Sequence, residues 1–110
     1  MADKILLVQG DTLPWITLTL TNPETGDAID VSEPDTTVNV YFRAAGSTTV
    51  LSTLACTKVV GITNKVRFNF PSPALDVPPG SYEGEVEIDY GDAIQTVYEV
   101  LKFRVREQFA

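Results

Sequence analysis

The sequence contains no histidine and a single cysteine, Cys56, in 110 residues. Histidine is the commonest general base, so its absence excludes histidine-based acid–base catalysis and a Cys–His nucleophile within this chain. Zinc sites of the usual kinds need several Cys or His side chains, which the chain does not supply. A lone cysteine also excludes an intramolecular disulfide. The absence of a disulfide is typical of proteins made in a reducing compartment. We expect Cys56 to be a small buried residue.

Long apolar runs and positive charge are also scarce. The apolar run Ile5 to Val8 is too short for a signal peptide, and no segment reaches the length of a membrane span. Eight Lys and Arg residues stand against fifteen Asp and Glu residues, which gives a net charge of −7. Nucleic acids and anionic membranes bind through basic patches, so neither is an expected partner. No glycine-rich phosphate loop is present, and no cofactor is predicted.

Apolar and polar residues alternate with a period of two in most of the chain. The alternation is clearest in "WITLTLT" (15–21), "TTVNVYFRA" (36–44) and "KVRFNF" (65–70). With its many β-branched residues, this pattern predicts strands that bury one face. Further strands are expected at 81–90 and 94–106. The drifting alternation of 50–60 predicts a bulge or two short strands there. The sequence therefore predicts an all-β fold, an antiparallel β-sandwich of about seven strands.

The segment "LDVPPGSY" (75–82) makes this prediction more specific. A crossing loop followed by Gly, one residue and a Tyr that opens a strand resembles the tyrosine corner of immunoglobulin-like domains. We therefore expect residues 10–110 to form a single immunoglobulin-like antiparallel β-sandwich. Residues 1–9 are interpreted as an N-terminal arm or a first strand.

The strand that follows carries acids at every second position: Glu83, Glu85, Glu87 and Asp89. A turn at Gly91-Asp92 would lay the last strand beside them, with Lys102, Arg104 and Arg106 pointing outward. We interpret these acids as a solvated charged face, and the alternatives are a docking surface, a cation site or catalysis. Acid–base catalysis needs an enclosing pocket, which a flat strand lacks, so no enzyme is expected.

A second acidic segment, "TGDAIDVSEPD" (25–35), holds Asp27, Asp30, Glu33 and Asp35. Calcium loops commonly show the spacing D-x-D-x-D-G, which is absent here. We interpret the segment as a solvated loop, with calcium binding as the alternative.

Seven apolar or aromatic residues are candidates for contact with a protein partner. Three aromatic residues fall on outward sides of their strands, where such rings serve as interface anchors or stack on sugars, although Trp15 could instead pack over the sandwich edge. The run "ILLV" (5–8) does not alternate. It is either a first strand that switches sheets and buries both sides, or an arm that packs on a neighbouring subunit. The candidate contact residues are Ile5, Leu6, Leu7, Val8, Trp15, Tyr41 and Tyr98.

The order of turns and strands resembles one known family. "QGDTLPWITLTLTNPETGDAIDVSEPDTTVNVYFR" (9–43) resembles the opening of the immunoglobulin-like domain at the N-terminus of bacteriophage baseplate upper proteins. Its Gly-Asp-Thr start, alternating strand, "GDAIDV" turn and V-x-V-x-F strand follow that family's order. "NKVRFNFPSPALDVPPGSYEGEVEIDYGDAIQTV" (64–97) and "KFRVRE" (102–107) are similar to its second half and closing strand.

The resemblance implies a non-enzymatic structural protein of the bacteriophage virion, made in the host cytoplasm, with no catalytic residues to carry over. The family's long helical and receptor-facing parts have no counterpart in this sequence. We therefore expect one of three roles: a decoration or cement protein of the capsid, an accessory protein of the tail, or a component of the baseplate. The expected partners are other capsid or tail proteins in many copies, with self-association as an option. The outward aromatic residues motivate an alternative, a carbohydrate-binding or adhesive immunoglobulin-like module.

Overall fold

The computed structural model describes residues 4–22, 24–97 and 100–109, and in these residues every regular element is a strand. None of the described segments forms a helix long and apolar enough to cross a membrane. The described strands are β1 (Ile5–Val8), β2 (Ile16–Thr19), β3 (Thr37–Ala44), β4 (Ser52–Ala55), β5 (Thr57–Lys58), β6 (Lys65–Phe68), β7 (Gly80–Asp89), β8 (Ile94–Thr96) and β9 (Leu101–Arg106). The all-β prediction is confirmed. The described strands number nine because the segments 50–60 and 94–106 each contain two, and two short strands were one of the alternatives predicted for 50–60.

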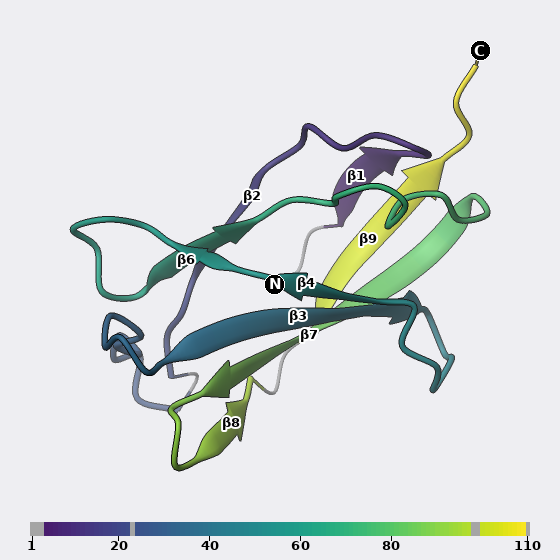
Figure 1. The fold of residues 1–110 in the computed structure, drawn as a ribbon. Helices are drawn as coiled ribbons and strands as arrows, with labels where there is room; N and C mark the ends of the chain where they lie inside the picture. Colours follow the sequence, from purple (N-terminus) through teal and green to yellow (C-terminus); the bar gives the residue numbers. More distant parts are fainter. Residues whose placement is uncertain (1–3, 23, 98–99, 110) are drawn as a thin grey trace.

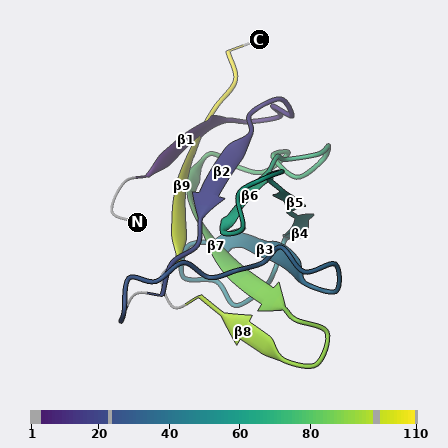
Figure 2. The ribbon, with the colours of Figure 1, turned by 90° about the vertical axis from the view of Figure 1, so that its left-hand side faces the viewer.

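The strands form two sheets that pack face to face (Figures 1 and 2). The large sheet has the order β1-β9-β7-β3-β4, with β8 also paired to β7, and the small sheet has the order β2-β6-β5. The chain crosses from one sheet to the other several times along its length, as it does in immunoglobulin-like sandwiches. The pairing departs from a purely antiparallel sandwich at one edge, where β1 runs parallel to β9.

Period-two alternation places the core where the sequence predicted it. Along β9 the residues alternate strictly between buried and exposed, and β3 buries Val38, Val40 and Phe42. Strand β7 buries Tyr82, Gly84, Val86 and Ile88, so its acids point outward. The ring of Phe42 lies 5.5 Å from those of Phe70 and Phe103 and stacks on Tyr82 at 5.1 Å. Each such aromatic pair stabilises the fold by about 0.5–1.5 kcal/mol in addition to the free energy gained by burying the apolar surface of the rings.

The segment 50–60, whose alternation drifts, supplies one strand to each sheet. Strand β4 pairs with β3 in the large sheet, and β5 pairs with β6 in the small sheet. Cys56 lies between them, and its backbone N–H donates to the carbonyl of Val38 at 2.9 Å. The drift in the pattern therefore marks the place where the chain changes sheets.

The predicted final strand is divided between β8 and β9. Both strands pair with β7, and the register shifts between them. Thr96 pairs with Glu87 and Leu101 pairs with Gly84, so an advance of five residues along the last segment matches an advance of three along β7. The chain from Thr96 to Leu101 is thus two residues longer than the part of β7 that lies opposite it. An offset of two preserves strand parity, so Lys102, Arg104 and Arg106 are exposed as the sequence predicted.

The tyrosine corner is confirmed. The hydroxyl of Tyr82 donates a hydrogen bond to the carbonyl oxygen of Pro78, four residues upstream. The ring is buried beneath the crossing loop and stacks on Phe42, and burial raises the pKa of Tyr82. This bond joins the loop that crosses between the sheets to the start of the longest strand.

Replacing Tyr82 by Phe removes this hydrogen bond and keeps the ring. We expect the free energy of unfolding, measured by urea denaturation, to fall by about 0.5–1.5 kcal/mol. Tyr90→Phe is the matched control, because the Tyr90 hydroxyl bonds to the Gln95 side chain in an exposed hairpin. Equal losses in the two variants would contradict a structural role for the corner.

Gly84 lies where the backbone of β7 meets the core without room for a side chain. A Cβ at this position would lie 2.9 Å from the ring of Phe103 and 3.0 Å from the Val40 side chain. Gly84→Ala should therefore lower the free energy of unfolding by about 1–3 kcal/mol through overpacking. Glu85→Ala, the neighbouring exposed position, should change it by less than about 0.5 kcal/mol in the same urea titration.

Candidate interaction surfaces

The run Ile5 to Val8 is divided between the core and the surface. Strand β1 pairs with β9 of its own chain, where Leu7 is buried and Ile5 packs against the core. Leu6 points the other way and is 78% exposed. The run therefore lies in one sheet and buries one side. Leu6 is its accessible apolar residue, beside a hollow of about 190 Å³ that Arg104 and Arg106 also line.

Trp15 lies just before β2, at the outer face of the small sheet, and is half exposed. The guanidinium of Arg67 lies 4.7 Å from the centre of its ring, which is a cation–π contact. Thr17 and Thr19 continue this face along β2, and Thr17 lies opposite Arg67 in the register. One face of the indole is thus in contact with its own chain, and half of the residue remains accessible.

Tyr41 lies on the outer face of the large sheet, opposite Glu85 in the register. Its hydroxyl donates to Oε1 of Glu87 at 2.8 Å. This hydrogen bond raises the pKa of Tyr41, and burial and the nearby carboxylates add to the increase. Tyr98, the remaining candidate contact residue, lies outside the described residues.

The alternating acids of β7 meet cations and donors from strands on both sides. Glu83 forms an ion pair with Arg43 of β3, with 3.3 Å between Nε and Oε1, and lies opposite Lys102 of β9. Glu87 accepts from Tyr41, and Asp89 accepts from the backbone N–H of Gly91 at 2.8 Å. Sequence reasoning looked for partners on the last strand and missed those on β3. The outward positions of Tyr41 and Arg43 in "NVYFRA" were the available signal.

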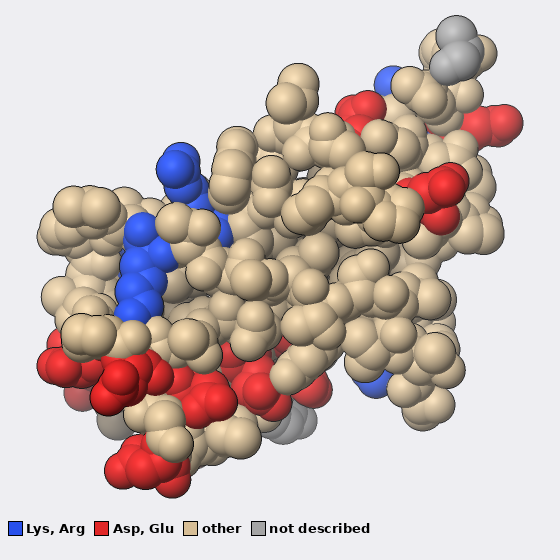
Figure 3. Space-filling model, viewed as in Figure 1, with Lys and Arg blue, Asp and Glu red and all other residues tan. Residues whose placement is uncertain are grey.

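The acidic residues of the β2–β3 loop are exposed and do not converge. The Asp30 carboxylate accepts from the N–H and the hydroxyl of Ser32, and these bonds lower the pKa of Asp30. The Lys58 ammonium donates to the backbone carbonyl of Glu33. Figure 3 shows acidic side chains gathered along the lower left edge, over this loop and the β7–β8 hairpin. In the described part of the chain, no three Asp, Glu or Cys side chains are placed to hold one metal ion.

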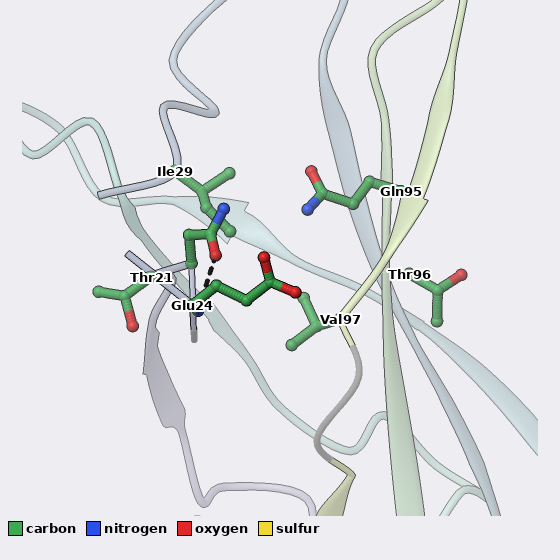
Figure 4. Close-up of a pocket in the computed structure, with 7 residues that line it drawn as sticks. Thr21, Glu24, Ile29, Gln95, Thr96 and Val97 are labelled. Atoms are coloured by element: carbon green, nitrogen blue, oxygen red, sulfur yellow. Dashed lines mark hydrogen bonds between the residues drawn. The ribbon is translucent and has the colours of Figure 1, made fainter. Parts of the chain in front are cut away.

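A hollow of about 230 Å³ lies where the edges of the two sheets face each other (Figure 4). Thr21, Asn22, Glu24 and Ile29 line it from the small-sheet side, and Gln95, Thr96 and Val97 line it from the β8 side. The Asn22 side chain accepts from the backbone N–H of Glu24 at 2.9 Å. The lining of this hollow includes one carboxylate, from Glu24, together with amide and hydroxyl groups. These residues include no nucleophile paired with a general base. A larger hollow, about 300 Å³, lies at the β5–β6 turn beside Lys58, Val60 and Ile62.

Comparison with protein-family models gives no match, and comparison with curated proteins gives none either.

Cys56 is the remaining chemically reactive side chain, and its surroundings suppress its reactivity. Burial raises the pKa of its thiol to about 12. The thiolate is the reactive form of cysteine. Cys56 is partly buried against the core, where the sequence predicted a buried residue, and its thiol is unreactive at neutral pH.

The folded protein should react slowly with Ellman's reagent at pH 8. A thiol with a pKa of about 12 is roughly one part in 10⁴ thiolate at this pH, against about a quarter for an unperturbed thiol. The rate should rise about tenfold per pH unit, and denaturation in guanidinium should restore the rate of a free cysteine. Equal rates in folded and denatured protein would contradict the burial of this thiol.

Proposed function

We propose that the protein is a non-enzymatic structural component of a bacteriophage particle. It would bind other virion proteins in many copies, as a capsid decoration or cement protein or as a tail or baseplate accessory. Its candidate contact surfaces are the exposed parts of β1 and of the small sheet.

The placement of the resembling motifs in the fold carries this proposal. The Gly-Asp-Thr motif at residues 10–12 precedes β2, and the "GDAIDV" turn at 26–31 lies between β2 and β3. The Pro-Gly-x-Tyr motif opens β7 and forms the tyrosine corner through Tyr82. These positions agree with the order of turns and strands that the resemblance implies. This agreement supports a structural module of that kind.

The distribution of polar groups supports a binding role over catalysis. The carboxylates of β7 lie on an outward strand face, where Arg43, Tyr41 and Gly91 engage three of them. These partners orient the carboxylates at the surface of the sheet, where Glu83 also lines a shallow hollow of about 210 Å³ with Lys4 and Lys102. Acid–base catalysis depends on burial and like charges to shift pKa values. An ordered polar face of this kind suits recognition of another protein surface.

The geometry does not favour the alternative of a carbohydrate platform. Trp15 lies on the small-sheet side and Tyr41 on the large sheet, so the two rings lie on opposite faces of the sandwich. Arg67 stacks on Trp15, and the Tyr41 hydroxyl is bonded to Glu87. A sugar platform needs neighbouring rings with free faces, which these two do not provide.

The first test is quantitative mass spectrometry of purified particles of the phage that encodes the protein, with the major capsid protein as the internal standard. We expect the protein to be present in many copies. Hundreds of copies per particle would identify a head protein, and a few to a few dozen a tail or baseplate component. Its absence from purified particles would overturn the proposal.

The contact surface can be mapped by rebinding purified protein to particles that lack it. Because Leu7 is buried in β1, deleting residues 1–9 would disturb the core, and point variants are the sharper probe. Leu6→Glu and Trp15→Ala should each weaken rebinding about tenfold or more if these side chains anchor the contact. Thr48→Glu, at an exposed loop position, is the matched control and should bind as the unmodified protein does.

A further inference from the structure

The outer face of the large sheet is divided into two halves of opposite charge. The dividing line runs across the strands at the level of Gly84, which lies opposite Phe42 on one side and Leu101 on the other. Outward side chains on one side of this line are mainly cationic, and those on the other side are acidic. This division is a property of the folded sheet, since the charged residues come from β3, β7, β9 and the residue that precedes β1.

The cationic half gathers five of the eight Lys and Arg residues of a strongly acidic chain. Lys102, Arg104 and Arg106 are exposed on β9, and Lys4 lines a hollow of about 210 Å³ together with Lys102. Arg43 neutralises the one acid of this half, Glu83. In the described residues, Arg43–Glu83 is the one pair of opposite charges within 4.0 Å. Arg104 donates to the Ser81 hydroxyl at 3.3 Å, and Arg106 donates to the Glu107 carbonyl at 2.9 Å and lies 4.9 Å from the centre of the Phe109 ring. These partners are uncharged, so the positive charges of both side chains are not neutralised by a carboxylate of the described residues.

The acidic half consists of Glu85, Glu87 and Asp89 on β7, flanked by β3 and β8. Tyr41 holds the Glu87 carboxylate in position through a 2.8 Å hydrogen bond. Each half also carries one exposed aliphatic side chain. Leu6 is 78% exposed beside Arg104, and Ile94 is 64% exposed opposite Asp89.

We propose that this face binds the same face of a second copy of the protein. The two copies would be related by a two-fold axis that lies in the interface, across the strands at the level of Gly84. This rotation reverses the strand direction, so the cationic half of each copy lies over the acidic half of the other. A face with this charge pattern is complementary to itself, and an isologous pair of this kind closes as a dimer.

The area is sufficient for a specific, reversible dimer. The strands of the large sheet comprise 35 residues, and each residue covers about 4.8 Å by about 3.3 Å of the face. The face would therefore bury roughly 550 Å² on each copy and roughly 1,100 Å² in total, which is close to the lower end of standard protein interfaces. The net charge of −7 on each copy opposes association at long range. At 0.15 M salt, screening limits this repulsion to distances of about 8 Å. The charge pattern of the two facing surfaces therefore determines whether the copies associate.

The test is sedimentation equilibrium of the full chain, followed by charge reversal. We expect a reversible monomer–dimer equilibrium in 0.15 M NaCl that shifts towards monomer in 1 M NaCl, where screening shortens to about 3 Å. Glu85→Lys with Glu87→Lys makes the face predominantly cationic, with Glu83 and Asp89 unchanged, and Arg104→Glu with Arg106→Glu makes it predominantly acidic. Each double variant alone should dimerise at least about tenfold more weakly, because like charges then face each other.

A mixture of the two double variants should form a heterodimer, since a cationic face then meets an acidic one. This result also shows that both variants are folded. Glu24→Lys with Asp27→Lys, in the exposed β2–β3 loop, is the matched control and should dimerise at least as well as the unmodified protein. A monomer at all concentrations in 0.15 M NaCl, unchanged dimerisation of both double variants, or a mixture without heterodimer would each overturn the proposal. None of these results depends on whether the protein occurs in virions.

Discussion

Phe42 joins the two layers of the sandwich, and the other elements are placed around it. Its ring stacks on Tyr82 of β7 and meets Phe70 and Phe103 edge to face. These contacts bring together β3, β7 and β9 of the large sheet and the segment that follows β6 of the small sheet. Gly84 lies beside Phe42 in the register and leaves space for the Phe103 ring. Close packing at this point depends on a large ring on one strand and the absence of a side chain on the next.

The same alternation that builds this core also builds the surface. Every second residue of β7 and β9 is buried, so the residues between them form rows of acids and cations on one outer face. The antiparallel pairing of β7 with β9 then places the cations of β9 beside the start of β7, while most of the acids lie towards its end. A charge pattern with opposite halves is therefore a direct result of strand register. The outer face of the small sheet differs, with threonines, Lys65, Arg67 and the half-exposed Trp15.

Local patterns are sufficient to predict most of the fold. "TTVNVYFRA" and "KVRFNF" identify strands and their buried sides, and "PPGSY" identifies the tyrosine corner. The drifting alternation of 50–60 marks an irregular segment, although the pattern does not show that its two halves join different sheets. The offset between β8 and β9 was missed, because two extra residues preserve the parity of exposed and buried positions. The parallel pairing of β1 with β9 was also missed, since an apolar run without alternation does not specify a partner strand.

The strands, their inward sides, the turns and the acidic character of the protein can all be predicted from the amino-acid sequence. These properties depend on neighbouring residues, through backbone preferences and the period of two. Contacts between outward side chains are evident only in the folded chain, because Arg43 and Glu83 are 40 residues apart and Tyr41 and Glu87 are 46 residues apart. The exposure of Leu6 beside the buried Leu7, and the positions of Trp15 and Tyr41 on opposite faces, also follow from the three-dimensional arrangement. These relations depend on strand order and register, which arise from the packing of distant segments into one core.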